Sequence, residues 1–346
     1  MAVVALDIGG ANLKMADSEG SAWSEPFAVW RAPDALSRVI GRCLRRVSSV
    51  ERLLITMTAE LCDCYVSKSE GVRAVLDAVV VAAEAAGVRP DAILVWSTTE
   101  SWVSVEQARA GPLQVAAANW LATARWLAQR VAPQHALLVD VGSTTSDVIL
   151  VGDGRVQTLG RDDTSRLRSR ELVYVGVRRT PVPMLVEAVP WQQAMLPVAR
   201  ELFATTGDVF LLRGDLAEEP TRTDTADGRP FTKPAARRRL ARVVCADAGP
   251  ESDVLIERVA SYVADRVEEL VASAVAAQLR RSGGRVGRVV VAGEGEFLAR
   301  RAVARGGWSG LIESLSGLVG REASMAAAAW AMVQLHGRSR DAARGG

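Results

Sequence analysis

Two short stretches of this chain place a carboxylate at the end of an apolar run, directly before a glycine turn. Residues 6–14 read LDIGGANLK, and residues 140–148 read DVGSTTSDV. Asp7 and Asp140 hold equivalent places in the two stretches. A hairpin turn rich in glycine and small polar residues can aim several backbone N–H groups at one phosphate, and the missing Cβ allows close approach. The stretches therefore predict two phosphate-binding hairpins.

Two other nucleotide-binding loops are excluded. The chain lacks the G-x-G-x-x-G of a Rossmann dinucleotide site and the G-x-x-x-x-G-K-[ST] of a P-loop at these turns. A third glycine turn lies in VVVAGEGEFLAR, after an apolar run. The residues predicted to hold phosphate are Gly9, Gly10, Asn12, Lys14, Gly142, Ser143, Thr144, Thr145, Gly293 and Gly295. Asp7 and Asp140, with Asp147 as a third candidate, are predicted to bind Mg²⁺, which prefers oxygen ligands.

The elements that must position these residues follow from hydrophobic periodicity. Apolar runs predict strands around the first turn and at 52–59, a helix spans 70–87, and another covers about 113–131. The pattern then restarts at 136–154 as strand, turn and strand, which indicates two related halves.

The predicted division of the chain is a first domain at 1–133 and a second at 134–322. The helix at 323–336 is expected to pack back on the first domain. Residues 214–234 are polar and rich in turn formers, which predicts a lid-like loop, and residues 337–346 are expected to be a disordered tail.

Composition narrows the class of protein. Of 346 residues, 49% are hydrophobic, and the formal net charge is only +2, which argues against a nucleic-acid or membrane-surface binder. The four cysteines form no zinc pattern. No basic leader precedes the first apolar run, and charges interrupt the longer ones, so we expect a cytoplasmic protein.

The three glycine turns, in this order, resemble those of the actin/hexokinase/Hsp70 superfamily. That resemblance implies an α/β fold of two ribonuclease-H-like domains around a central cleft. Longer stretches are more specific: TMTAELCDCY, SKSEGV, AAANW, ELVYVGVRRTPV, FATTGDVFLL and TADGRPFTKPAARRRLARVVCAD. With the two hairpins, they resemble the hydantoinase/oxoprolinase-related proteins of the tetrahydromethanopterin-linked one-carbon pathway, from about residue 3 to residue 335.

This family resemblance implies a transferase of methanofuran or methylofuran biosynthesis. It would join an aminomethylfuranylmethyl diphosphate to the phenol oxygen of a glutamyltyramine and release pyrophosphate. The two hairpins and Mg²⁺ would then hold the leaving diphosphate, with Asp7, Asp140 and Lys14 among the catalytic residues. The partners are small-molecule substrates, and a homodimer remains open.

Charged side chains outside the hairpins are candidates for the rest of the site. Glu60 or Asp63 would bind the substrate ammonium or act as a base; a solvated charged loop is the alternative reading. Lys68 is a further substrate-binding candidate. Arg178 and Arg179 would grip a carboxylate or phosphate as planar forks, or else form structural ion pairs.

Two other functions remain open. An ATP-dependent small-molecule kinase, or an ATP-driven amidohydrolase, is what the superfamily usually implies, and it would bind ATP between the same hairpins. A non-catalytic, nucleotide-gated scaffold would assemble with nucleotide and show no turnover.

Overall fold

The computed structural model describes residues 2–344, and its contacts divide the chain into two compact units. The first unit comprises Met1–Leu138, Ile149–Ser169 and Glu313–Gly346, and the second comprises Val139–Val148 and Arg170–Ile312. This grouping differs from the predicted boundary after residue 133, because residues 149–169 make their contacts with the first unit. Among the described residues, no helix is long and apolar enough to cross a membrane.

A six-stranded sheet forms the centre of the first unit. Its strands, in spatial order, are β3 (Ala22–Pro26), β2 (Asn12–Asp17), β1 (Ala2–Ile8), β4 (Val50–Met57), β5 (Ile93–Trp96) and β6 (Trp102–Val103). β1, β2 and β3 are antiparallel neighbours, whereas β4 and β5 run parallel to β1. This meander of three strands followed by parallel additions is the strand order of a ribonuclease-H-like domain, which confirms the predicted fold class.

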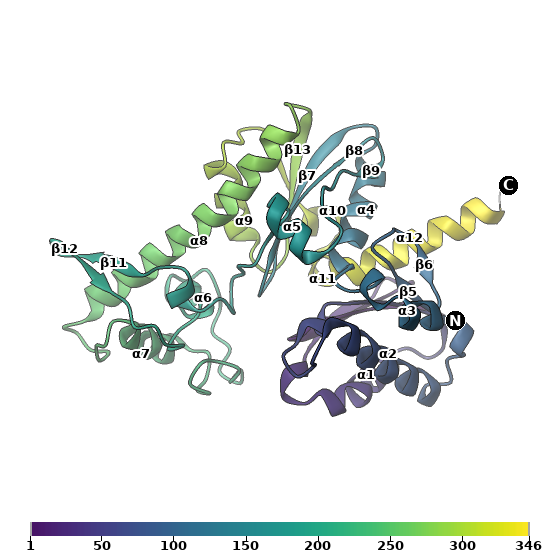
Figure 1. Cartoon of the computed structure of the whole chain (residues 1–346), viewed down its shortest axis with the longest axis horizontal. Coiled ribbons are helices and arrows are strands. Elements are labelled where there is room, and N and C mark those ends of the chain that lie inside the picture. Colours follow the sequence, from purple (N-terminus) through teal and green to yellow (C-terminus); the bar gives the residue numbers. More distant parts are fainter. Residues whose placement is uncertain (1, 345–346) are drawn as a thin grey trace. The chain divides into compact units, whose positions relative to one another are not determined.

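Helices cover both faces of this sheet, so β1 is buried along its whole length. One face packs on α1 (Leu36–Leu44) and α2 (Lys68–Ala85), which lie side by side in Figure 1. The opposite face meets α12 (Ala327–Arg344), which also packs on α4 (Asn119–Val131). The remaining helices of this unit are α3 (Val105–Ala110), α5 (Asp163–Ser169), α10 (Leu315–Val319) and α11 (Arg321–Met325).

Short 3-10 turns join several of these elements. They are η1 (Val29–Arg31), η2 (Pro33–Ala35), η3 (Ala59–Leu61), η4 (Pro90–Ala92), η5 (Pro112–Gln114) and, in the second unit, η6 (Val182–Met184).

A second mixed sheet contains β10 (Leu172–Val173), β8 (Ser146–Gly152), β7 (His135–Val141), β13 (Val286–Ala292) and β14 (Leu311–Ser314), with β9 (Arg155–Val156) paired to β8. In the second unit the long helix α8 (Asp253–Arg281) packs against α9 (Glu296–Arg305), α6 (Thr206–Leu212) and α7 (Lys233–Val243). A separate hairpin of β11 (Ala188–Trp191) and β12 (Ala194–Pro197) packs on α8, as Figure 1 shows.

Two local expectations differ from the structure. The helix predicted at 113–131 begins only at Asn119, because Pro112 starts a 3-10 turn and Ala117 takes a left-handed backbone with φ of 47°. The tail predicted to be disordered from residue 337 continues α12 as far as Arg344. Residues 345–346 lie outside the described residues.

Gly71 provides a test of the packing in the first unit. A Cβ at this position in α2 would lie 2.4 Å from the backbone oxygen of Glu60, which cannot move aside like a side chain. We expect Gly71→Ala to lower the free energy of unfolding by about 1–3 kcal/mol, measured by urea denaturation. The matched control is Gly41→Ala in α1, where the nearest atom is 3.6 Å away.

Gly41→Ala should be neutral or raise the free energy of unfolding by up to about 1 kcal/mol, because alanine is the better helix former. Equal effects of the two substitutions would contradict the close packing of α2 on Glu60.

Candidate functional site

The first predicted hairpin joins β1 and β2. Its turn is closed by the N–H of Gly9, which donates to the carbonyl of Asn12 at 3.0 Å. Asp7 ends the buried strand and is only 4% exposed. Lys14 is its directly opposite partner on β2, so both side chains leave the same face of the sheet. A carboxylate and a cation therefore flank this turn.

The second hairpin, between β7 and β8, is closed in the same way. The N–H of Gly142 donates to the carbonyl of Thr145 at 2.8 Å. Asp140 corresponds to Asp7, and Asp147, five residues after the turn glycine, corresponds to Lys14. The repeated closing hydrogen bond supports the internal repeat read from the sequence. The second hairpin differs in flanking its turn with two carboxylates.

Backbone from residues 176–179 packs directly on the second turn. The N–H of Val177 donates to Gly142 O, and those of Arg178 and Arg179 donate to Ser143 O, each at 3.0 Å. A Cβ on Gly176 would lie 2.4 Å from the nitrogen of Thr144. Only glycine permits this approach, so the segment fixes the turn's conformation.

The third predicted turn, at 293–295, reaches the same place in the second unit. Gly293 has φ of 87°, and its missing Cβ would lie 2.4 Å from Asp140 Oδ1. The N–H of Gly295 donates to Val141 O at 2.8 Å. Asp140, the turn at 142–145 and the turn at 293–295 thus lie together in the second unit.

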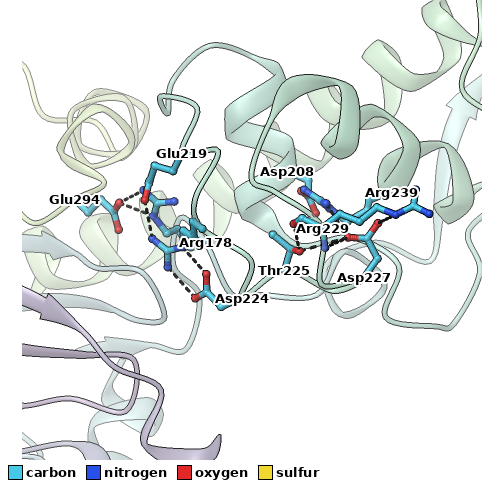
Figure 2. A network of polar contacts seen from close by, with 10 residues as sticks. Arg178, Asp208, Glu219, Asp224, Thr225, Asp227, Arg229, Arg239 and Glu294 are labelled. Carbon is cyan, nitrogen blue, oxygen red and sulfur yellow. Dashed lines mark hydrogen bonds and ion pairs between the residues drawn. The ribbon is translucent and has the colours of Figure 1, made fainter. Parts of the chain in front are cut away.

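Arg178 lies beside this cluster with its side chain 9% exposed. Its guanidinium contacts Glu219 and Glu294, each at 2.5 Å, and lies over the ring of Phe231 at 5.0 Å. Figure 2 shows the two ion pairs, which join the loop at 214–234 to the turn at 293–295. Buried Nη1 has no hydrogen-bond partner among the described residues. Part of the fork predicted to bind substrate is therefore occupied by protein carboxylates.

The lid-like loop is anchored by a second, deeper ion pair. Arg239 of α7 is 1% exposed and donates to Asp208 of α6 at 2.6 Å and to Asp227 of the loop at 2.9 Å. Figure 2 shows Thr225 and Arg229 completing this corner of the loop. The loop is thus attached to the unit through buried charge.

Glu60 is the most unusual charged residue in the first unit. It lies in η3 immediately after β4, is 1% exposed, and neither carboxylate oxygen has a hydrogen-bond partner among the described residues. Burial raises the pKa of Glu60 to about 7, against the lowering effect of nearby backbone N–H groups and of Lys68, while Asp163 adds to the rise. Such a carboxyl can exchange a proton near neutral pH.

Lys68 lies near Glu60 but is ion-paired, its Nζ being 2.5 Å from Asp163 Oδ2. Asp163 begins α5, 95 residues further along the chain. On the same short helix, Arg166 stacks on Trp120 with its guanidinium 3.8 Å from the ring centroid. Asp63, predicted as a neighbour of Glu60, is exposed in the turn that follows.

Sequence reasoning missed the partners of the predicted residues. Asp163 and Glu219 belong to no recognised motif, and Glu294 lies in the third glycine turn without a predicted role. Their pairing with Lys68 or Arg178 depends on distant segments. Ala117, which lies beside Glu60, is the exception: it belongs to the AAANW stretch, which was already distinctive in the sequence.

The metal prediction can be compared with the donor atoms present. Among the described residues, no three His, Cys, Asp or Glu side chains gather closely enough to hold a metal by themselves. Mg²⁺ commonly binds through one or two carboxylates and substrate phosphates, so this finding fits a site completed by its ligand. Asp7 belongs to the first unit and Asp140 to the second.

The chain is similar to known proteins over most of its length. The family model described as Hydantoinase/oxoprolinase matches residues 54–333. A Methanocaldococcus jannaschii protein named (4-{4-[2-(gamma-L-glutamylamino)ethyl]phenoxymethyl}furan-2-yl)methanamine synthase is 31% identical over 336 residues, covering 96% of this chain and 97% of its own.

Solved structures show likeness in fold. Nucleotide-free acetone carboxylase aligns with a TM-score of 0.51 at 12% identity, covering 88% of this chain and 67% of its own. The ROK family glucokinase from Streptomyces griseus, solved with glucose and AMPPNP, aligns with a TM-score of 0.46 at 12% identity. The alignment covers 95% of this chain and 98% of the glucokinase.

The Arg239 anchor can be tested by stability. Arg239→Ala leaves the carboxylate of Asp208 buried without its guanidinium, so we expect the free energy of unfolding to fall by about 3–5 kcal/mol in chemical denaturation. The control is Arg237→Ala on the same helix, whose exposed pairs with Asp253 and Glu257 should contribute less than about 1 kcal/mol. Comparable losses in both variants would show that the buried pair is not the stronger anchor.

Proposed function

The chain belongs to the hydantoinase/oxoprolinase family, and within it we propose a transferase that forms an aryl ether in methanofuran-type cofactor synthesis. The electrophile is an aminomethylfuranylmethyl diphosphate, the nucleophile is the phenol oxygen of a glutamyltyramine, and pyrophosphate is released. The product is the phenoxymethylfuran methanamine that names the Methanocaldococcus jannaschii relative. The observation that carries this proposal is the likeness to that relative across 96% of this chain.

The paired hairpins support the proposal on physical grounds. When the bond between the furanylmethyl carbon and the diphosphate oxygen breaks, its electron pair leaves with the diphosphate. The furan ring spreads the positive charge that develops on carbon, and the phenol oxygen then forms the new bond as it loses its proton. A site for this reaction must stabilise negative charge on the leaving group and hold the phenol in position.

The backbone turns at 9–12 and 142–145 are the groups we assign to the diphosphate. Each presents glycine backbone at a strand end, and the second adds the hydroxyls of Ser143, Thr144 and Thr145. Lys14 supplies a positive charge beside the first turn. Arg178 offers its unpaired Nη1 to an anionic substrate group, and exposed Arg179 is a further candidate.

We propose that Mg²⁺ binds the oxygen donors of these hairpins, with Asp7 of the first unit and Asp140 of the second as ligands and Asp147 as a supporting carboxylate. Bound Mg²⁺ would supply charge stabilisation to the leaving diphosphate. The protein's part is to hold the diphosphate oxygens with backbone N–H groups and hydroxyls.

The reaction itself is the first test. Given both substrates and Mg²⁺ but no ATP, the protein should form the ether and an equimolar amount of pyrophosphate, measured by mass spectrometry and a pyrophosphate assay. Omission of the phenol should abolish ether formation. If product appears only when ATP is added and converted to ADP, the kinase or ATP-driven amidohydrolase reading replaces the transferase.

The carboxylates of the two hairpins provide the second test. Asp7→Asn and Asp140→Asn should each lower kcat at least about 100-fold, because each removes charge that organises the leaving-group site. Asp77→Asn, on the exposed face of α2, is the control and should keep full activity. Melting temperatures close to wild type would show that the fold is intact, and activity retained in both hairpin variants would remove them from the site.

A further inference from the structure

Glu60 has a carboxylate that the fold itself does not use. Both oxygens are buried without a hydrogen-bond partner among the described residues. A buried polar group without a partner destabilises a protein, and an apolar side chain of similar size would avoid that cost. A polar ligand that reaches this carboxylate would account for it.

The position of Glu60 places it beside the first hairpin. The N–H of Thr58 donates to Ile8 O at 2.9 Å, which continues the pairing of β4 with β1 up to the glycine turn. A Cβ on Gly10 would lie 3.0 Å from Cys62 Sγ, on the other side of Glu60 in sequence. The segment that carries Glu60 therefore packs on the turn assigned to the diphosphate.

The backbone around Glu60 is held firmly. Gly71 of α2 approaches the Glu60 carbonyl so closely that no Cβ fits between them. On another side lies Ala117, whose left-handed backbone with φ of 47° is a conformation that non-glycine residues rarely adopt. Rigid backbone on two sides fixes where the carboxylate can lie, as a catalytic group requires.

Two opposite charges act on Glu60 from neighbouring elements. Lys68, at the start of α2, favours the ionised carboxylate, and Asp163, at the start of α5, opposes it. The two are ion-paired with each other, with side chains 29% and 15% exposed. Asp163 thus holds the ammonium group of Lys68 in place and also offsets part of its positive charge.

We propose that Glu60 is the base that accepts the phenolic proton in ether formation, and that Lys68 and Asp163 are positioning residues for it. This inference rests on the transferase function proposed above. The phenol O–H bond breaks, its proton goes to the Glu60 carboxylate, and the oxygen electron pair forms the bond to the furanylmethyl carbon. The carboxylic acid then returns the proton to solvent, so protons and charge balance.

Separating the two half-reactions tests the assignment. Glu60→Gln should lower ether formation at least 100-fold while it still releases pyrophosphate from the furanylmethyl diphosphate, because the leaving-group site remains. In that reaction water takes the place of the phenol, so the other product is the furanylmethyl alcohol, and the proton lost by water goes to solvent. Glu84→Gln, on the exposed surface of α2, should behave as wild type in both assays. Ether formation by Glu60→Gln at the wild-type rate would overturn the proposal.

The pH dependence of kcat/KM tests the positioning roles of Lys68 and Asp163. In wild type the rate should fall as pH drops through about 7, because Glu60 becomes protonated. Asp163→Asn removes a negative charge and leaves Lys68 less neutralised, so the acidic limb should move to lower pH. Lys68→Gln removes the positive charge, so the limb should move to higher pH.

Shifts of the acidic limb in opposite directions in the two variants are a result that a merely structural ion pair would not give. Movements in the same direction, or no movement, would overturn the positioning role. If Glu60→Gln raises the KM for one substrate and leaves the acidic limb in place, Glu60 binds a substrate ammonium instead, and the proposal also fails.

Thermal stability gives a readout that is independent of turnover. Because folding raises the pKa of Glu60, burial of the carboxyl disfavours the folded wild type progressively as pH rises from about 4.5 through about 7. Glu60→Gln carries no such charge, so its melting temperature should exceed that of wild type at pH 8, with the gap closing towards pH 4.5. A gap of the same size at both pH values would contradict a buried, titrating Glu60.

The outcomes also distinguish failure of this inference from failure of the proposed function. If wild type forms no ether under any condition, the transferase assignment fails. If wild type forms the ether and Glu60→Gln does so equally well, only the assignment of the base fails.

Discussion

Close contact between backbone segments at strand ends is the constraint on which the second unit's site depends. Gly176 and Gly293 each approach the β7–β8 hairpin so closely that a Cβ would lie within 2.4 Å of its atoms. Gly176 packs on the turn at 142–145 itself, and Gly293 packs on the end of β7 directly before it. A turn fixed in this way can keep its N–H groups in place without rearrangement, which is what electrostatic stabilisation of a leaving group requires.

Charged residues have different tasks in the two units. In the second unit, Arg239 is paired with the carboxylates of Asp208 and Asp227, so its burial organises the protein. Arg178 is paired in part: Glu219 and Glu294 take Nη2 and Nε, while Nη1 has no partner among the described residues. In the first unit, Glu60 is buried without such compensation. Burial with partners is typical of architecture, whereas burial without them is more often explained by function.

The sequence predicted the features that depend on local pattern. The glycine turns, their order and the internal repeat were visible because each is a short signature, and the strand order of the first unit confirmed the fold they implied. The predicted start of α4 at about residue 113 was wrong, because the left-handed backbone at Ala117 interrupts the apparent helical periodicity. Contacts such as Lys68 with Asp163 could not be predicted, because they join residues 95 positions apart that share no motif.

The first unit is built from three separated stretches of chain, including both the N-terminal strand β1 and the C-terminal helix α12. During synthesis α12 emerges after the whole of the second unit, which is continuous from Arg170 to Ile312 apart from the stretch Val139–Val148. Domains generally fold as units while the chain emerges. The first unit, although begun earlier, is therefore completed after the second unit. Until then one face of its sheet lacks the helix that covers it.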